Sequence, residues 1–233
     1  MKITWYGHSC FRLETGSANL LIDPFLTGNS TFEDSGKSVD EVATGTTHVL
    51  LTHGHDDHVG DTKAICEKSG ATLVAVYELA LYLQAQGVEK IDLGNPGGTL
   101  TAAGVDVTFV NAAHSSSTMV DGKPVYLGAS CGLVFRADGE PTIYHMGDTD
   151  VMSDMAITSD LYEPKVGIVP IGDRFTMGAK SAAFACRRFF RFETIIPCHF
   201  GTFPIIDQSA DAFVAEMDGH NVVVPNVGEP ITV

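Results

Sequence analysis

The chain has 233 residues, of which 14 are Lys or Arg and 29 are Asp or Glu, so its formal net charge at pH 7 is −15. So strong a negative charge repels nucleic acid and anionic membranes, and no basic patch in the sequence opposes it. Hydrophobic residues make up 44% of the chain and charged residues 18%, which excludes the disordered class. We expect a single folded domain over residues 1–233.

The five cysteines, Cys10, Cys66, Cys131, Cys186 and Cys198, are widely spaced and include no Cys-x-x-Cys pair. An odd, scattered set of this kind does not indicate a disulfide framework. The first residues enter a strand pattern without an apolar leader, and no apolar run reaches about 18 residues. We therefore expect a cytoplasmic protein without a membrane partner, and association into homo-oligomers stays open.

The first half of the chain predicts a β-rich segment followed by alternating strands and helices. Short strands are expected at residues 2–6, 10–14 and 19–22, a polar loop at 27–38, and a buried strand at 48–51. A helix over residues 61–69 follows, with Asp61 at its N-cap and Gly70 just beyond its end. A strand at 73–76 and a helix at 78–86 complete this half.

The second half repeats this order. Residues 99–136 indicate β structure, with the clearest strands at 105–110 and 125–135. Strands are then expected at 142–144, 166–169, 194–196 and 221–224, alternating with helices at 152–161, 178–190 and 208–217. We therefore expect an α/β protein of two similar halves, with their sheets facing each other and their helices outside.

The strongest functional signal is the segment Thr52-His53-Gly54-His55-Asp56-Asp57-His58, which directly follows the buried strand. It places three of the nine histidines within six residues, together with a carboxylate. Imidazoles and carboxylates crowded in this way are typical metal ligands, and Gly54 is expected to let the loop bend so that they converge. A polar surface loop rarely concentrates ligand types so strongly.

Three more candidate ligands follow later strands. His114 comes after the strand at 105–110, Asp148 after the strand at 142–144, and His199 after the strand at 194–196. Each residue alone is compatible with a structural role, such as a hydrogen-bonded histidine or a turn aspartate. Because all three stand at the carboxyl ends of strands, they favour one site shared with the 53–58 loop.

The order and spacing of these ligands resemble the hydrolases of the metallo-β-lactamase fold, and the resemblance extends over essentially the whole chain. Further matching segments are Gly7-His8-Ser9-Cys10-Phe11, Ile22-Asp23-Pro24-Phe25, His145-Met146-Gly147-Asp148-Thr149 and residues 170–178. Together they are similar to a widespread group of bacterial and archaeal metal-dependent hydrolases related to the L-ascorbate-6-phosphate lactonases. The resemblance implies a four-layer αβ/βα sandwich with metals in the cleft between the sheets.

The resemblance also implies two divalent ions per chain. It assigns His53, His55 and His114 to the first ion, Asp57, His58 and His199 to the second, and Asp148 to a bridge between them. Imidazoles suit Zn²⁺, the expected ion, although sites that contain carboxylates also accept Mn²⁺, Fe²⁺ or Ni²⁺. Such a pair activates a water molecule as nucleophile, so Asp57 and Asp148 are the expected catalytic carboxylates, with Asp57 orienting the water.

Four polar residues beside the ligands are candidates to orient them. Asp23 stands at a strand end before Pro24, where it is expected to accept the second N–H of a ligand histidine. His145, Ser115 and Thr149 are expected to act in the same way.

Three residues are candidates for substrate contacts. His8 is expected near the cleft, where it would contact a ligand or the substrate. Arg174 follows the strand at 166–169 and is the first candidate to bind an anionic substrate group, and Lys180 is the second.

The leading expectation is a metal-dependent hydrolase of a small-molecule ester, lactone or phosphorylated metabolite, and lactone chemistry rests on the resemblance alone. Oxygen-reducing diiron relatives carry Glu where His55 stands, which favours hydrolysis here. Phosphodiesterase or nuclease action is an alternative, which the charge of −15 and the lack of a basic channel oppose. A non-catalytic metal- or ligand-binding protein is the other alternative, and chelator-sensitive turnover would separate it from an enzyme.

Overall fold

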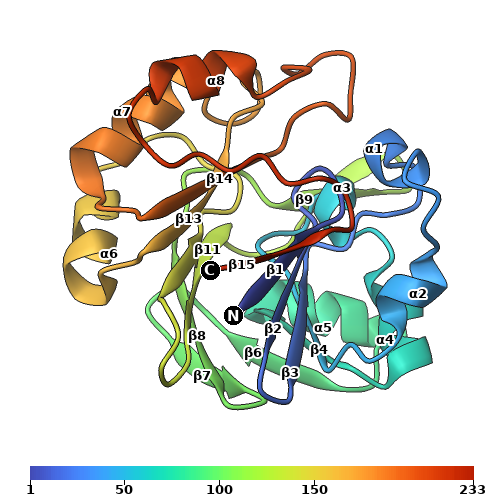
Figure 1. Cartoon of the computed structure of the whole chain (residues 1–233). Coiled ribbons are helices and arrows are strands. Elements are labelled where there is room, and N and C mark those ends of the chain that lie inside the picture. The colour runs from blue at the N-terminus through green and yellow to red at the C-terminus, as the bar shows by residue number, and fades with distance from the viewer.

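The strands form two large sheets and one separate hairpin in the computed structural model of residues 1–233 (Figure 1). The first sheet has seven strands in the order β15-β1-β2-β3-β4-β5-β6. Their bounds are β1 (Lys2–Trp5), β2 (Phe11–Thr15), β3 (Ala18–Ile22), β4 (His48–Leu50), β5 (Thr72–Val76), β6 (Ile91–Gly94) and β15 (Pro230–Thr232). Strands β15 to β3 pair antiparallel, whereas β3 to β6 pair parallel.

The second sheet has six strands in the order β14-β13-β12-β11-β8-β7. Their bounds are β7 (Thr99–Ala102), β8 (Val105–Asn111), β11 (Cys131–Arg136), β12 (Ile143–His145), β13 (Val166–Pro170) and β14 (Thr194–Cys198). The antiparallel part, β7 to β12, precedes the parallel part, β12 to β14, as in the first sheet. The hairpin of β9 (Ser117–Val120) and β10 (Lys123–Tyr126) belongs to neither sheet.

Most helices lie on the outer faces of the two sheets, whereas the short helices α1 and α3 lie at the ends of the strands (Figure 1). Their bounds are α1 (Ser30–Glu33), α2 (Val39–Ala43), α3 (Asp56–Val59), α4 (Thr62–Ser69), α5 (Tyr77–Ala85), α6 (Asp154–Tyr162), α7 (Ala179–Phe189) and α8 (Asp211–Glu216). Helices α4 and α5 pack on the parallel strands of the first sheet, and α6, α7 and α8 lie beside the second. The expected α/β class, with two facing sheets and outer helices, is confirmed. None of the helices is both long enough and apolar enough to cross a membrane.

One hydrophobic cluster of 60 buried residues joins the sheets and helices. The parallel strands supply much of it, because a strand covered on both faces must be apolar at every position. All five residues of β13, Val-Gly-Ile-Val-Pro, are buried. The cluster fixes the carboxyl ends of β4, β12 and β14, from which the candidate ligands extend.

Three expected elements differ from the structure. The strand expected at 125–135 is two strands, β10 and β11, which Gly128 separates with a φ of +88°. The strand expected at 221–224 is a single bridge between Val222 and Ile195, and the chain instead ends in β15 against β1. The loop expected at 27–38 contains the short helix α1, capped by the Asn29 side chain.

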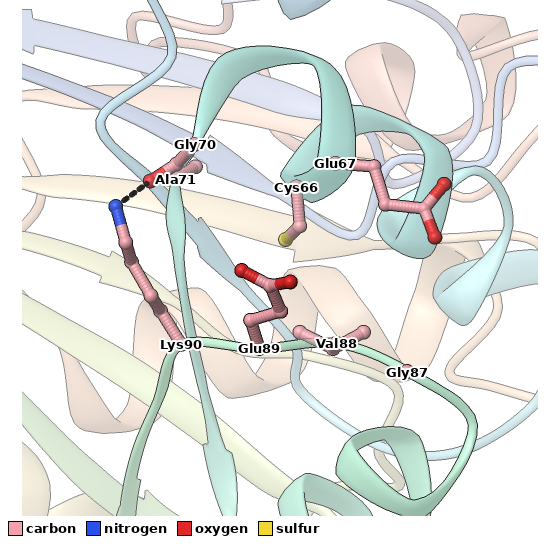
Figure 2. Close-up of a pocket in the computed structure, with 8 residues that line it drawn as sticks. All are labelled: Cys66, Glu67, Gly70, Ala71, Gly87, Val88, Glu89 and Lys90. Carbon is pink, nitrogen blue, oxygen red and sulfur yellow. Dashed lines mark hydrogen bonds between the residues drawn. The ribbon is translucent and has the colours of Figure 1, made fainter.

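A hollow of about 210 Å³ lies on the outside of the first sheet, between α4 and the segment that leads into β6 (Figure 2). Its lysine, Lys90, donates a hydrogen bond from Nζ to the Gly70 carbonyl at 2.9 Å. Burial raises the pKa of the Cys66 thiol in its wall to about 12, so this thiol stays protonated at neutral pH. No histidine lines the hollow, and it has no cluster of metal-binding groups.

Candidate metal centre

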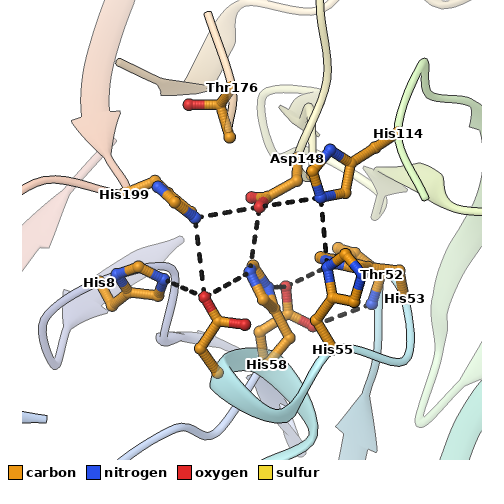
Figure 3. Close-up of polar contacts among 12 residues, drawn as sticks. His8, Thr52, His53, His55, His58, His114, Asp148, Thr176 and His199 are labelled. Atoms are coloured by element: carbon orange, nitrogen blue, oxygen red, sulfur yellow. Dashed lines mark hydrogen bonds and ion pairs between the residues drawn. The ribbon is translucent and has the colours of Figure 1, made fainter. Parts of the chain in front are cut away.

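The candidate ligands come together because they all follow strands at one end of the two sheets (Figure 3). The 53–58 loop follows β4 of the first sheet, and His114, Asp148 and His199 follow β8, β12 and β14 of the second. His55 is the N-cap residue of α3, whose first turn holds Asp56 and Asp57. Negative side chains suit this position because the helix dipole is positive there.

His53, His55 and His114 form the first set of donors. The Nδ1 atom of His55 lies 2.9 Å from His53 Nε2 and 3.3 Å from His114 Nε2. The other nitrogens of two of these rings are occupied, since Thr52 Oγ1 lies 3.0 Å from His53 Nδ1 and Ser115 Oγ lies 3.2 Å from His55 Nε2. Three imidazole nitrogens therefore converge on one point, which is the arrangement that Zn²⁺ prefers.

Asp57, His58 and His199 form the second set. The Oδ2 atom of Asp57 lies 3.9 Å from both His58 Nε2 and His199 Nε2. Asp148 stands between the two sets, with its Oδ2 atom 3.3 Å from His58 Nε2, 3.0 Å from His199 Nε2 and 3.6 Å from His114 Nε2. All seven expected ligands thus lie together, in positions where one carboxylate can serve both sets.

Unpaired polar atoms show that this donor set fits a metal. His58 Nε2 and Asp148 Oδ1 are buried and have no hydrogen-bond partner. Buried polar atoms without partners are costly, and two of them facing one small space indicate a missing cation. The mixture of neutral imidazoles and carboxylates suits a divalent transition-metal ion.

The two sets differ in charge. Burial lowers the pKa of His53 well below its usual range and also lowers the pKa values of His55 and His114, so the first set is neutral. Burial alone would lower the pKa of His58, but Asp148 and the other carboxylates around it raise this pKa well above its usual range. The second set is therefore rich in negative charge and attracts a cation.

Asp23 supports His58 from behind. Its side chain is fully buried and its Oδ2 atom accepts a hydrogen bond from His58 Nδ1 at 2.8 Å. Thr52 donates to the same carboxylate from its backbone N–H at 2.9 Å and from its hydroxyl at 2.7 Å. This hydrogen bond keeps one proton of His58 on Nδ1, so Nε2 is the nitrogen that can release its proton and bind a metal.

His8 lies against the second set but does not face a substrate. Its Nε2 atom is 3.1 Å from Asp57 Oδ2, and its Nδ1 atom is 3.1 Å from Thr202 Oγ1. The ring packs on His199 with centroids 4.0 Å apart and is fully buried. Of the two expected contacts, the structure therefore shows the one with a candidate ligand, Asp57, because a ring without exposed surface does not reach a substrate.

His145 and Thr149 also differ from the expectation that they orient ligand histidines. His145 is fully buried, and its Nδ1 atom accepts a hydrogen bond from the Gly147 N–H at 3.1 Å. The Thr149 hydroxyl accepts from the Ala113 N–H at 3.0 Å. Both residues therefore shape the backbone next to Asp148 and His114 and make no hydrogen bond to a ligand ring.

Gly54 was expected to let the ligand loop bend, but the structure shows that glycine is needed here for close packing. Its φ does not lie in the left-handed region. A Cβ atom at this position would lie 2.6 Å from Leu127 Cδ1 and 2.8 Å from Leu127 Cβ. Glycine thus allows the segment that leads into β11 to pack directly against the ligand loop.

Arg174 and Lys180 do not reach the ligands. Both are exposed, and neither lines the cavity beside the site. The Arg174 guanidinium instead lies 5.6 Å from the ring of Phe175, its neighbour in the chain. The structure therefore places neither residue in the lining of this cavity, and their contact with an anionic substrate group stays a prediction.

Sequence reasoning missed several residues at the site. Thr52 and Thr202 bind Asp23 and His8, yet isolated threonines give no signal of such a role in a sequence. A cavity of about 440 Å³ opens beside His55 and Asp57, with Phe25 among its lining residues. Its walls come from segments that are far apart in the chain, so only the fold reveals them.

Known proteins match the chain along nearly its whole length. Residues 2–199 match a family model described as the beta-lactamase superfamily domain. A UPF0173 metal-dependent hydrolase from Chelativorans sp. (strain BNC1) is 55% identical over 235 residues, 99% of either chain, and one from Sinorhizobium medicae (strain WSM419) is 55% identical over 231 residues, 98% of either chain. The solved structure of a metallo hydrolase from the archaeon Ignicoccus hospitalis KIN4/I has a TM-score of 0.86 at 30% identity, covering 99% of this chain and 97% of that one.

These similarities confirm the metallo-β-lactamase fold and the expectation of a metal-dependent hydrolase. The clusters of histidine and aspartate side chains at the ends of β4, β8, β12 and β14 are candidates to bind its metal. The chain therefore belongs to the UPF0173 family of metal-dependent hydrolases within the beta-lactamase superfamily.

Proposed function

We propose that this hydrolase binds two divalent ions, preferably zinc, and cleaves an ester or lactone of a small molecule. The observation that carries the proposal is the position of Asp148 Oδ2 between two sets of three donors. Ions bound by these sets would lower the pKa of water toward neutrality and polarise the oxygen of the bond to be cleaved. Mn²⁺, Fe²⁺ or Ni²⁺ would suit the same donors.

Asp57 is the proposed catalytic carboxylate at the mouth of the site. Its side chain is 29% exposed and lines the cavity, whereas Asp148 is 2% exposed. Burial raises the pKa of Asp57, but His58 and the hydrogen bond from His8 outweigh this and hold the pKa below its usual range. The ionised carboxylate can therefore accept a hydrogen bond from the attacking water and fix its orientation.

Asp148 is the proposed shared ligand and the more buried of the two candidate ligand carboxylates. Burial raises its pKa, but His199 and His58 beside it hold the pKa well below its usual range. The ionised side chain is enclosed by these two histidines and by His114. It supplies negative charge to both donor sets at neutral pH.

An ester or lactone fits the site better than a phosphorylated compound. No lysine or arginine lines the cavity beside Asp57, although such side chains commonly hold a substrate phosphate. The same absence opposes phosphodiesterase or nuclease action, because a nucleic-acid backbone needs basic contacts. A protein that only binds a ligand would leave the water-facing carboxylate of Asp57 without a role.

The proposal is tested by elemental analysis of the purified protein together with hydrolysis assays. We expect about two metal ions per chain and turnover of at least one p-nitrophenyl ester or lactone, lost on chelation and restored by metal. p-Nitrophenyl phosphate and bis(p-nitrophenyl) phosphate serve as the matched phosphorus substrates. No rate above buffer with any ester or lactone in the metal-loaded protein would overturn the proposal.

A further inference from the structure

The cavity beside the metal centre has one aromatic wall. It is lined by Phe25, His55, Asp56, Asp57, Ser117, Thr118, Met119 and Phe203. The rings of Phe25 and Phe203 are stacked, with centroids 5.9 Å apart and planes 23° apart. Both rings also pack edge-on against the buried ring of His8, at 5.7 Å and 5.4 Å. The wall is therefore held rigid by the same histidine that positions Asp57.

The hairpin β9–β10 forms another part of the lining. Thr118 ties this hairpin to α3, because its hydroxyl donates a hydrogen bond to Asp56 Oδ1 at 2.7 Å. The next residue, Met119, is 60% exposed although it is apolar. A methionine has a flexible, polarisable side chain that adapts to apolar ligands of different shape. The cavity thus combines a rigid aromatic surface with an adaptable one.

The side chains around the cavity offer no partner for an anionic occupant. Its only charged lining groups are the acidic residues Asp56 and Asp57, within a chain of net charge −15. The basic residues expected to hold an anion, Arg174 and Lys180, lie outside the lining. A negatively charged substituent would lose its hydration here without meeting a lysine or arginine, whereas an apolar substituent would be stabilised by leaving water and packing against Phe25 and Phe203.

We propose that this cavity takes an uncharged, apolar substituent of the substrate, the size of a phenyl ring or a short alkyl chain. Phe203, Phe25 and Met119 are then the residues that determine specificity, while His55 and Asp57 at the inner end of the cavity belong to the metal centre. The inference rests on the proposed ester or lactone hydrolysis and adds the class of substrate. A substrate bound at the metal centre can extend a substituent into this space, because His55 and Asp57 belong to both.

The test compares three p-nitrophenyl esters on the metal-loaded protein. Hexanoate has an apolar chain, the monoester of adipate has a chain of the same length that ends in a carboxylate, and acetate is too short to fill the cavity. We expect kcat/KM for hexanoate to exceed that for the adipate monoester by about tenfold or more and that for acetate by about tenfold. Equal values for the three esters, or a preference for the adipate monoester, would overturn the inference.

Two pairs of variants test whether the lining residues cause the preference for the hexanoate ester. Phe203→Ala should lower kcat/KM for hexanoate by about 10- to 100-fold and that for acetate by less than about threefold. The control Phe184→Ala removes a phenylalanine of α7 that is 51% exposed and lies outside the lining, so it should change neither value. Loss of acetate turnover in the same proportion as hexanoate would refute a specificity role for Phe203.

The second pair adds charge without removing the aromatic wall. Met119→Lys should raise the adipate-to-hexanoate ratio by about threefold, because the new ammonium faces the cavity. The control Val120→Lys places the same charge on the adjacent residue of β9, which points to the opposite face of the strand and does not line the cavity. An equal change in both variants would mean that the charge acts at long range and that the lining does not select the substrate.

A binding measurement separates failure of this inference from failure of the proposed function. If no ester or lactone is hydrolysed, the proposed function fails. Calorimetric titration with 4-phenylbutyramide then tests by itself whether the cavity binds an uncharged, apolar group. We expect saturable binding that Phe203→Ala weakens and Phe184→Ala leaves unchanged. The opposite outcome is chelator-sensitive turnover of p-nitrophenyl acetate with no preference for the hexanoate ester and no binding of 4-phenylbutyramide. This result would overturn only the inference about the cavity.

Discussion

Replacing Asp23 with Asn should weaken metal binding without changing any proposed metal ligand. The buried carboxylate accepts hydrogen bonds from Thr52 N at 2.9 Å, Thr52 Oγ1 at 2.7 Å and His58 Nδ1 at 2.8 Å. In Asp23→Asn the amide oxygen can still accept from Thr52, which turns the amide NH₂ group toward His58 Nδ1. This nitrogen must then accept a hydrogen bond, so the proton of the ring moves to Nε2, where it blocks metal binding.

The size of the effect follows from this change of tautomer. Loss of a hydrogen-bonded partner behind a metal-binding histidine typically lowers metal affinity by about 10- to 100-fold. Since each factor of ten is about 1.4 kcal/mol, binding of the ion at the second set should weaken by about 1.4 to 2.8 kcal/mol. The first set, His53, His55 and His114, has no direct contact with Asp23 and is linked to it only through the Thr52 hydroxyl beside His53 Nδ1, so its affinity should fall by less than that of the second set.

The assay is competition for metal with a chromogenic chelator, and Asp61→Asn is the matched control. Asp61 also accepts three hydrogen bonds, from Leu26 N at 3.1 Å, Thr27 N at 2.8 Å and Thr27 Oγ1 at 2.7 Å, but it touches no ligand. We expect Asp23→Asn to lose affinity mainly for one ion and Asp61→Asn to lose none. Wild-type affinity for both ions in Asp23→Asn would refute the reasoning, and equal losses in both variants would show a general loss of stability.

Three further predictions concern the shared ligand, the packing of the ligand loop and the thiols. Asp148→Ala should lower the metal content and abolish hydrolysis with an unchanged circular dichroism spectrum; full metal content by elemental analysis would contradict its bridging position. Gly54→Ala should lower the free energy of unfolding by about 1–3 kcal/mol, because its Cβ meets Leu127, and urea titrations should show partial recovery on adding Leu127→Ala. Burial raises the pKa values of the Cys66 and Cys186 thiols to about 12, whereas in the unfolded chain they ionise near pH 8.5, roughly the free-thiol value. The unfolded state therefore loses protons first as the pH rises, so urea midpoints should fall above about pH 8.5; a rising or constant midpoint between about pH 8 and 10 would contradict this.

The candidate metal ligands could be recognised in the sequence because their signal is largely local. His53, His55 and His58 lie within one short loop, and the later ligands each follow a recognisable buried strand. Strand ends at the same edge of a sheet lie near one another, which accounts for His114, Asp148 and His199 on the second sheet. Their proximity to the 53–58 loop depends in addition on the packing of the two sheets, which the repeated order of the two halves and the resemblance led us to expect. The same logic fails for Arg174, which also follows a strand, because its loop places the guanidinium in solvent beside Phe175.

The parts of the fold that could not be predicted depend on contacts between distant segments. The strand expected at 125–135 is apolar almost throughout, yet Gly128 breaks it and sends its two halves into different sheets. Strand β15 gains its pairing only from β1, at the opposite end of the chain. Phe25 and Phe203 are ordinary apolar residues in the sequence, and only their stacking beside the site gives them a role in the proposed specificity.

Three of the eight non-glycine residues with positive φ angles stand at this site. His8, Asp23 and His199 all have positive φ angles, of 51°, 44° and 59°, although none is glycine. A left-handed conformation costs such residues on the order of 1–2 kcal/mol each, so it persists only where the surroundings enforce it. Here the backbone N–H of His199 donates to the carbonyl of His8 at 3.1 Å, which joins the β1–β2 turn of the first sheet to the end of β14 in the second. The strained residues therefore hold the metal-binding loops of the two sheets together, and the second donor set exists only while the sheets stay packed against each other.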